Sequence, residues 1–496
     1  MALPADFSLD LCKQIAGWRY EDLPSQVVRT VKLCLADTLG VTGGAARAAG
    51  IPELNARLKR WDQGGAATGL IGRRRLSPPH AALINGSAAH ALDYDDIHDA
   101  ARVHSGCVVL PAVLAAAEES GQVSGREFLL ALAVGMEMHA RLGLACYNSL
   151  AMGWHPTAIF GAMAGALAAG RVLRLDAPQL RDALGMAFHQ ASGSAQSAYD
   201  GVLAKRLGAG FAARDAVTSA CLAADGLSGT HAPLEGRAGF FALYMGGEVK
   251  PELLTDGLGS QWHAGDYSLK PYPACRCNHG AIAQGVKLHG EGITAGSVAA
   301  VEIGMSHANW TLVGRPYEAA LGTVHAQFSA AYSFARALSD GKVGPGSYEP
   351  AAIGDAAISA LTAKVRVFAD PDIPRDAMEP VRIRLTLDGG RVITLRCDTL
   401  KGSRQEPMTE REVQDKLRGC FAFGLDAPPE AADRVAQTVF DIDREADAAS
   451  AICRAFPQEN GVKPLVQASL GASLNGTSNG TSNVTSSVTS NRRTMA

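Results

Sequence analysis

Seven side chains that carry a carboxyl, phenol or imidazole group lie within twelve residues of this chain, directly before an apolar run over residues 108–117. They are Asp93, Tyr94, Asp95, Asp96, His98, Asp99 and His104. Burial beside an apolar run removes water from such groups and shifts their proton affinities. A carboxylate and an imidazole in this segment are therefore candidates for acid/base chemistry. The alternative interpretation is a solvated acidic loop without a catalytic role.

Three basic side chains elsewhere could meet an anionic ligand. His155 precedes Pro156, which suits the first turn of a helix and leaves His155 at a helix N-terminus, a place that favours anions. The alternative is that His155 only begins the helix. Lys205 comes just before a helix of small residues, and Lys270 opens a stiff Lys-Pro-Tyr-Pro turn. Lysines at such boundaries usually face solvent, so their positions alone assign them no role.

A second group of reactive residues is Cys275-Arg276-Cys277, followed by His279. It has the form of half a metal site, but structural zinc needs four ligands at paired short spacings and no second Cys/His pair has that form. The sequence therefore predicts no metal. The chain has 10 cysteines and no secretory features, so they are expected to be reduced thiols that pack in the core or line a cleft.

The composition predicts a large globular protein. The chain has 496 residues, of which 47% are hydrophobic and 19% charged, which allows about two to three domains with an extensive core. The net charge of −3 gives no electrostatic basis for binding nucleic acid or an anionic membrane surface. The first twenty residues lack the pattern of a targeting signal, and no uninterrupted apolar stretch has the roughly 20 residues of a spanning helix. We expect a cytoplasmic protein that does not enter a membrane.

Residues 1–268 are predicted to form the first part of a helical domain. Apolar residues recur at helical spacing over residues 25–39, 126–142, 157–173 and 180–191, and Ser124 with Glu127 forms a capping box. Small residues dominate residues 161–170, which lets helices approach closely but buries little area per side chain. The helices must therefore share an extensive core.

The pattern changes over residues 269–402, which are predicted to form an inserted α+β domain. Strands are expected at residues 298–303, 364–368, 381–387 and 391–396, with a turn at 388–390 and a helix over 324–338 that covers one face of the sheet. Residues 403–458 return to helical spacing, begin with a capping box of Thr409 and Glu412, and should rejoin the first helical part. The fold class is mainly α with an α+β second domain. Residues 466–496 are a Ser/Thr/Asn-rich tail that is expected to be disordered.

Several separated blocks, in one order, resemble the MmgE/PrpD family over roughly residues 8–455. The blocks are Ala91-Leu92-Asp93-Tyr94-Asp95-Asp96 with His104, Gly153-Trp154-His155-Pro156, Lys205-Arg206 with Gly210-Phe211-Ala212-Ala213, and Ser268-Leu269-Lys270-Pro271-Tyr272-Pro273 with His279. The resemblance implies a large helical domain built from both chain ends and an inserted α+β lid. It also implies a homodimer, a small polycarboxylate as substrate, and no metal or organic cofactor.

The resemblance also assigns roles to residues. It implies that Asp93, His104, His155, Lys205 and Lys270 line a cleft between the helical domain and the lid. The chemistry of the family forms a carbanion next to a carboxylate, so the site needs cations and a group that moves a proton. We expect Asp93 and His104 to transfer protons, Lys205 and Lys270 to hold carboxylates, and His155 to act as an acid or a second clamp. Additional substrate contacts are expected from Tyr94, His98, Tyr272, Arg276 and His279.

Two departures from the family's decarboxylases bear on the reaction. Cis-aconitate decarboxylases carry Thr where Ile97 stands here, and Tyr at about the position of Leu312. The loss of two hydroxyls, each worth on the order of 1 kcal/mol, favours an altered ligand with an alkyl group. The sequence therefore predicts dehydration of 2-methylcitrate or a related alkylcitrate. The alternatives are decarboxylation of cis-aconitate, epimerisation of a dicarboxylate such as iminodisuccinate, and a carboxylate-binding scaffold that has lost turnover.

Overall fold

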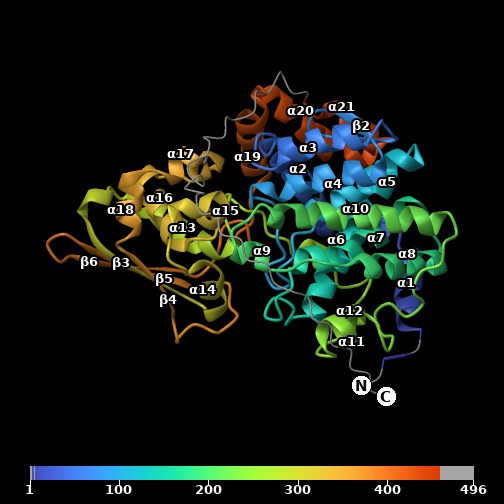
Figure 1. Ribbon diagram of the computed structural model, residues 1–496, viewed down its shortest axis with the longest axis horizontal. Helices are drawn as coiled ribbons and strands as arrows, with labels where there is room; N and C mark the ends of the chain where they lie inside the picture. The colour runs from blue at the N-terminus through green and yellow to red at the C-terminus, as the bar shows by residue number, and fades with distance from the viewer. Residues whose placement is uncertain (1–2, 5, 458–496) are drawn as a thin grey trace, which may run out of the picture. The chain divides into compact units, whose positions relative to one another are not determined.

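The computed structural model describes residues 3–4 and 6–457 of the chain (Figure 1). Within this part the chain forms 21 α-helices, a two-stranded sheet and a four-stranded sheet. The predicted class, mainly α with an α+β part, is confirmed. The tail predicted at residues 466–496 lies outside the described residues.

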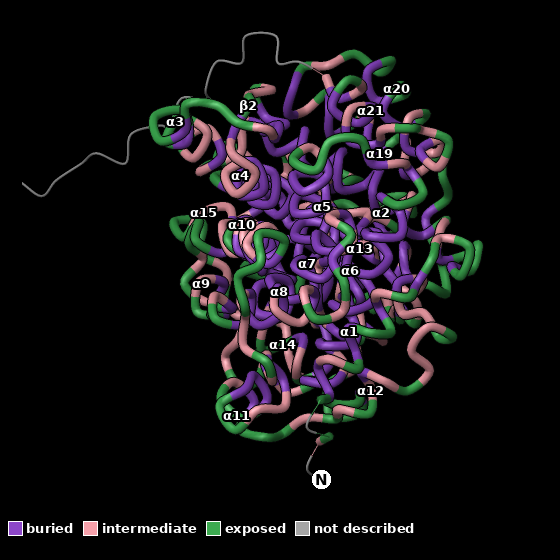
Figure 2. The backbone as a smooth tube through the Cα atoms, turned by 90° about the vertical axis from the view of Figure 1, so that its right-hand side faces the viewer, coloured by how far each residue is buried: buried purple, intermediate pink, exposed green. Residues whose placement is uncertain are grey.

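The predicted helices of the first part are present with slightly different ends. They are α2 (Ser25–Gly44), α6 (Gly125–Ala145), α7 (Pro156–Val172) and α8 (Ala177–Gln190). The hydroxyl of Ser124 accepts the backbone N–H of Glu127 and so caps α6. The apolar run after the ionisable cluster forms α5 (Gly106–Ser120), and residues 106–117 of this helix are all buried (Figure 2).

The crossing of α4 (Pro78–Ala91) with α10 (Ala204–Ala224) positions the two ends that matter for the site. A Cβ on Gly210 would lie 2.2 Å from the Ser87 hydroxyl oxygen and 2.4 Å from the Leu83 carbonyl oxygen. A Cβ on Gly86 would lie 3.0 Å from the Gly210 Cα. Only glycine permits this approach of the two backbones. The close contact brings the C-terminal end of α4 next to the first turn of α10.

The C-terminal helices pack against the first part of the chain, as the sequence predicts. They are α19 (Glu410–Leu425), α20 (Pro429–Phe440) and α21 (Ala448–Ala455). Thr409 and Glu412 form the predicted capping box of α19. Lys416 of α19 forms a buried 2.6 Å ion pair with Asp37 of α2 and donates to the backbone carbonyl of Tyr94 at 2.7 Å. The last helices therefore support the loop that follows α4.

The four-stranded sheet has the order β4-β3-β5-β6. The strands are β3 (Val298–Met305), β4 (Val365–Ala369), β5 (Val381–Leu387) and β6 (Val392–Cys397). β3 runs parallel to β4 and antiparallel to β5, and β5 and β6 form a hairpin whose turn uses positive φ at Gly389 and Gly390. Buried residues alternate along β5, as expected for a sheet with one covered face.

The helices on this sheet correct one prediction. α13 (His279–Gly290) and α16 (Ala330–Asp340) pack together and contact the strands. The single helix predicted over 324–338 is instead two helices, because α15 (Gly322–Gln327) ends before Ser329, whose hydroxyl caps the new helix α16.

The remaining elements complete the description. The helices are α1 (Phe7–Gly17), α3 (Ile51–Trp61), α9 (Gln196–Tyr199), α11 (Phe240–Met245), α12 (Glu252–Thr255), α14 (His307–Val313), α17 (Pro350–Ile353) and α18 (Ala356–Thr362), and the strands of the small sheet are β1 (Ala67–Gly69) and β2 (Arg74–Leu76).

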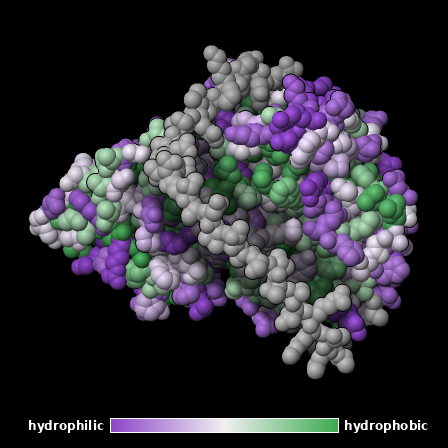
Figure 3. All heavy atoms as spheres, in the orientation of Figure 1, coloured by the Kyte–Doolittle hydropathy of each residue, from purple (hydrophilic) through white to green (hydrophobic). Residues whose placement is uncertain are grey.

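Buried hydrophobic residues form two clusters. The first contains residues from 7 to 269 and from 408 to 456, and the second contains Ala198 with residues from 274 to 400. The helix α6 is long and apolar enough to cross a membrane, but 94% of its apolar window is buried inside the protein, as in a core helix. Hydrophilic and hydrophobic residues are interspersed on the face shown in Figure 3.

Candidate active site

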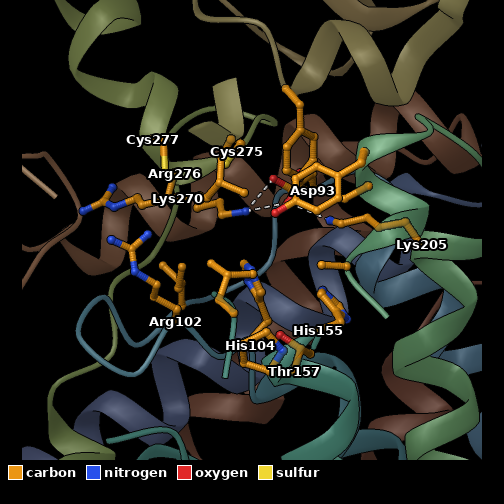
Figure 4. Close-up of a pocket in the computed structure, with 18 of the residues that line it drawn as sticks. Asp93, Arg102, His104, His155, Thr157, Lys205, Lys270, Cys275, Arg276 and Cys277 are labelled. Carbon is orange, nitrogen blue, oxygen red and sulfur yellow. Dashed lines mark hydrogen bonds and ion pairs between the residues drawn. The ribbon is translucent and has the colours of Figure 1, made fainter. Parts of the chain in front are cut away.

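A cavity of about 660 Å³, counted with the solvent at its mouth, brings together residues of the second hydrophobic cluster and of several segments that are distant in the chain. Its lining includes all five residues predicted to carry the chemistry, namely Asp93, His104, His155, Lys205 and Lys270, together with Arg276. Figure 4 shows Lys270 and Lys205 on either side of Asp93, with His104 and His155 together on another wall. The polypeptide thus gathers cations, a carboxylate and two imidazoles around one space.

Asp93 forms ion pairs with both lysines of the cavity. The Lys270 Nζ donates to the Asp93 Oδ1 and to its backbone carbonyl, both at 2.9 Å, and the Lys205 Nζ lies 3.3 Å from the same Oδ1. Burial alone would raise the pKa of Asp93, but Lys205 and Lys270 hold it well below the usual value. Asp93 is therefore a carboxylate that can accept a proton but has none to donate.

The backbone places these three side chains. Asp93 follows α4 with a φ of +52°, a left-handed conformation that Asp tolerates better than most residues. Lys205 is in the first turn of α10, which α4 meets at the glycine crossing. Ile97 and Ser268 exchange two backbone hydrogen bonds of 2.9 and 2.7 Å, which bring the segment of Lys270 alongside the loop.

The two imidazoles of the cavity are neutral when no ligand is bound. His104 donates from Nδ1 to the backbone carbonyl of Asp96 at 2.7 Å, so its Nε2 keeps a lone pair. Burial lowers the pKa of His104 to about 3, with Asp95 opposing the shift. His155 occupies the N-cap position of α7 without a capping hydrogen bond from its side chain. Burial, together with neighbouring His90 and Lys205, lowers the pKa of His155 well below the usual value.

Arg276 offers an uncommitted donor to an anion. Its Nε donates to Asp99 at 3.2 Å and its Nη1 donates to the Lys401 carbonyl at 2.9 Å. Its buried Nη2 has no hydrogen-bond partner among the described residues. Since Arg276 lines the cavity, a ligand carboxylate is a fitting partner for this group.

Comparison with known protein families decides the relationship. The model of the MmgE/PrpD N-terminal domain matches residues 9–252, and that of the MmgE/PrpD C-terminal domain matches residues 272–442. The chain belongs to the MmgE/PrpD family.

Similar curated proteins add the reaction class. A "Cis-aconitate decarboxylase-like protein oryM" of Aspergillus oryzae is 29% identical over 88% of this chain and 95% of its own length. A cis-aconitate decarboxylase of Aspergillus terreus is 29% identical over 82% of this chain and 88% of its own. The human cis-aconitate decarboxylase is 28% identical over 82% and 85%. These relatives mark the chain as a lyase-type enzyme of the MmgE/PrpD family.

Within this MmgE/PrpD site, four residues expected to contact substrate do not line the cavity: Tyr94, His98, Tyr272 and His279. The Tyr94 hydroxyl donates to the Pro271 carbonyl at 3.1 Å, and its ring lies under Lys416. Tyr272 packs its ring edge to face with His279 at 5.3 Å. Direct contact by these residues is not supported, because sequence proximity to the site does not fix which way a side chain points.

His279 and His98 do not line the cavity but bond to residues beside it. The His279 Nδ1 accepts from the Arg276 Nη1 at 3.4 Å, and its Nε2 donates to the Ala274 carbonyl at 3.2 Å. His279 therefore orients Arg276. The His98 Nδ1 accepts the backbone N–H of Ala101 at 3.1 Å, and its ring packs against Tyr267.

Several possible metal ligands in this MmgE/PrpD chain have other bonding partners. The Cys277 thiol donates to Asn309, and Cys275 and Cys277 line the cavity, one of the two predicted locations for the thiols. His98, His263 and Asp266 are close enough to share an ion. However, His98 accepts a hydrogen bond at Nδ1, so its Nε2 carries the proton and has no lone pair to offer. The expectation that no metal is needed stays a prediction.

The solvated-loop interpretation of the acidic cluster is wrong. Asp93 is 3% exposed, and Asp95 and Asp96 are fully buried. Sequence reasoning missed Arg102, which lines the cavity with a strained φ of +55°. It also missed His90 and gave no individual role to Asp95, although both lie next to His104 of the cavity. His90 lies three residues before Asp93, nearly one helical turn, which was a usable signal.

Proposed function

We propose that this lyase removes carbon dioxide from a small unsaturated polycarboxylate of the cis-aconitate type. The observation that carries the proposal is the convergence of two lysines, an unpaired arginine nitrogen and two neutral imidazoles on one cavity. The named activity of the similar proteins supports decarboxylation more directly than the dehydration of 2-methylcitrate that the sequence predicts.

Decarboxylation requires the site to stabilise negative charge and to supply a proton. When the carbon–carbon bond to the leaving carboxylate breaks, its electron pair remains on the substrate and spreads toward a neighbouring carboxylate. Fixed cations stabilise that developing charge best where water is excluded. Lys205, Lys270 and Arg276 supply positive charge at the cavity wall.

The substrate carbon must then receive a proton. Ionised Asp93 has no proton to give, so this role falls to an imidazole that has gained one. His104 fits because its Nδ1 is fixed by Asp96 and its Nε2 is the free atom of the ring. This differs from the expected pairing of Asp93 with His104, and it leaves Asp93 as the group that positions the lysines.

Dehydration of an alkylcitrate such as 2-methylcitrate is the second candidate, and one observation favours it. Ile97 and Leu312, the two positions where this chain lacks hydroxyls, both line the cavity. An apolar wall favours an alkyl substituent over a hydrated polar group. An alkyl-bearing substrate is therefore compatible with either reaction.

The test is to incubate the purified protein with cis-aconitate, 2-methylcitrate, citrate and iminodisuccinate. Carbon dioxide release, double-bond absorbance and optical rotation then report decarboxylation, dehydration and epimerisation separately. Release of carbon dioxide from cis-aconitate or an alkylated analogue supports the proposal. New double-bond absorbance from 2-methylcitrate without gas would favour the second candidate. Binding without any turnover would favour a scaffold.

Two variants test whether the apolar residues of the cavity wall determine the preference between substrates. Ile97→Thr and Leu312→Tyr each introduce a hydroxyl, and we expect them to raise kcat/KM for cis-aconitate relative to an alkylated analogue by several-fold, since one hydrogen bond is worth about 1 kcal/mol. Val392→Thr, on an exposed residue of β6, is the matched control and should leave the ratio unchanged.

A further inference from the structure

His90 and Asp95 form a buried pair directly behind the cavity wall. The His90 side chain comes from the last turn of α4 and Asp95 from the loop after it, and both side chains are fully buried. The His90 Nδ1 lies 2.7 Å from the Asp95 Oδ2. Burial would raise the pKa of Asp95, but the nearby imidazoles of His90 and His104 hold it well below the usual value. Asp95 is therefore ionised, and the His90 Nδ1 donates its proton to it.

This geometry leaves an unused base. With the proton on Nδ1, the His90 Nε2 carries a lone pair, and that atom is buried without a hydrogen-bond partner among residues 3–4 and 6–457. Buried polar atoms are nearly always satisfied, and an exception calls for a reason. A carboxylate that fixes one imidazole nitrogen so that the other can exchange a proton is the arrangement of a catalytic Asp–His pair.

His90 adjoins both imidazoles of the cavity. Its ring centroid lies 5.1 Å from that of His104 and 5.7 Å from that of His155. Asp95 also serves His104, whose Nδ1 lies 3.7 Å from the same Oδ2. Two imidazoles thus flank the Asp95 carboxylate, and a third, His155, adjoins His90. Of the three histidines, only His90 does not line the cavity.

The charges around His90 determine when its imidazole gains a proton. Ionisable groups from the loop after α4 and from α5, α7 and α10 face His90. They are Asp93, Asp95, His104, Cys107, His155 and Lys205. Burial lowers the pKa of His90, Asp95 opposes the shift, and Lys205 adds to it. An arriving polycarboxylate adds several negative charges beside Lys205 and so favours protonation of the neighbouring imidazoles.

We propose that His90 is a positioning residue that shares the proton taken up when the polycarboxylate binds and returns it to the substrate through His104 or His155. The inference rests on the proposed decarboxylation. In that reaction the carbon–carbon bond breaks, its electron pair stays on the substrate carbon, carbon dioxide leaves, and one proton forms the new carbon–hydrogen bond. Solvent then restores the proton balance of the three imidazoles.

The test counts protons and turnover separately. Calorimetric titration with cis-aconitate near pH 7.5, in buffers of different ionisation enthalpy, measures proton uptake on binding. His90→Asn keeps an N–H for Asp95 but has no titratable nitrogen. We expect the variant to lose most of the proton uptake and to show a kcat at least tenfold lower, with KM changed by less than about threefold. The expected minimum loss is smaller than the roughly 100-fold or more of a group that transfers the proton directly.

His139→Asn is the matched control. His139 is buried, its pKa is lowered to about 3 by burial, and its Nε2 is also without a partner in the described chain, but its Nδ1 bonds to the Ser105 hydroxyl and not to a carboxylate. It should keep the uptake of the wild type. If His90→Asn does not fold, Asp95→Asn tests the same relay by removing the counter-charge, and it should also suppress the uptake.

The outcomes separate this inference from the proposed function. Carbon dioxide release by the wild type, together with unchanged uptake and kcat in His90→Asn, would overturn the relay alone. Proton uptake that depends on His90, in a wild type that binds cis-aconitate without releasing carbon dioxide, would uphold the proton-sharing site and overturn the decarboxylation.

Discussion

Replacing Asp93 with Asn should show how much the free energy of unfolding depends on the carboxylate that neutralises the two buried lysines. Lys270 is fully buried and Lys205 is 6% exposed, and their ammonium groups lie 2.9 and 3.3 Å from the Asp93 Oδ1. Asn keeps the size of the side chain and one acceptor oxygen but removes the charge. The variant therefore leaves two like charges close together without the carboxylate that both of them contact.

Removing one member of a buried ion pair typically costs about 3–5 kcal/mol, because the remaining charge stays desolvated. An unfolding entropy of about 2.1 cal/mol/K per residue corresponds to roughly 1 kcal/mol/K for the described residues 3–4 and 6–457. The midpoint of thermal unfolding should therefore fall by about 3–5 °C. Raising the pH toward 10 should narrow the difference, since an unpaired buried lysine loses its proton more readily.

The matched control is Asp10→Asn. Asp10 also lies 2.9 Å from a lysine, Lys13, but both side chains are more than half exposed. Exposed pairs often contribute nothing measurable, so this variant should melt with the wild type. Scanning calorimetry on the three proteins gives the comparison. Equal melting temperatures for Asp93→Asn and Asp10→Asn would refute the view that Asp93 compensates the lysine charges.

Three further predictions follow from the geometry. Gly210→Ala forces α10 away from α4, which separates Lys205 from Asp93, so we expect a lower melting temperature and reduced turnover, whereas Ala at the solvent-open Gly419 should change neither. His104→Ala should lower kcat about 100-fold or more, as expected for a group that transfers a proton, while circular dichroism stays that of the folded protein; unchanged turnover would remove it from the mechanism. Acid should destabilise the protein. His98 and His139 have folded pKa values of about 4 and 3, depressed by burial from an unfolded value near 6.5, so the unfolded chain binds more protons and stability falls as pH drops from about 6.5 to 4. Each contributes about 1.4 kcal/mol per pH unit in that window, which denaturant titrations at a series of pH values will measure.

Local pattern was enough to predict the elements of the fold. Helical spacing predicted α2, α6, α7 and α8, and alternation predicted the strands of the larger sheet. The helix over 324–338 was misjudged because Ser329 begins a new helix inside a stretch that keeps helical spacing. Helix ends depend on single capping hydrogen bonds, which spacing does not reveal.

For the candidate site too, the sequence predicted some features and not others. Its blocks of sequence predicted Asp93, His104, His155, Lys205 and Lys270, all of which line the cavity. The blocks did not predict the direction of each side chain. The crossing at Gly86 and Gly210 and the backbone pairing of Ile97 with Ser268 decide that direction, and both join segments more than a hundred residues apart.

The sequence by itself determined the residue types, the helical and strand periods, and the family, because these are properties of neighbouring positions or of ordered motifs. Only the tertiary structure decided that Asp93 bridges two lysines, that Tyr94 and Tyr272 lie outside the cavity, and that Asp95 lies between His90 and His104. The physical reason is that charge and proton affinity depend on burial and on distances of a few ångströms between segments remote in the chain. Those distances are set by packing, and packing is a property of the whole fold.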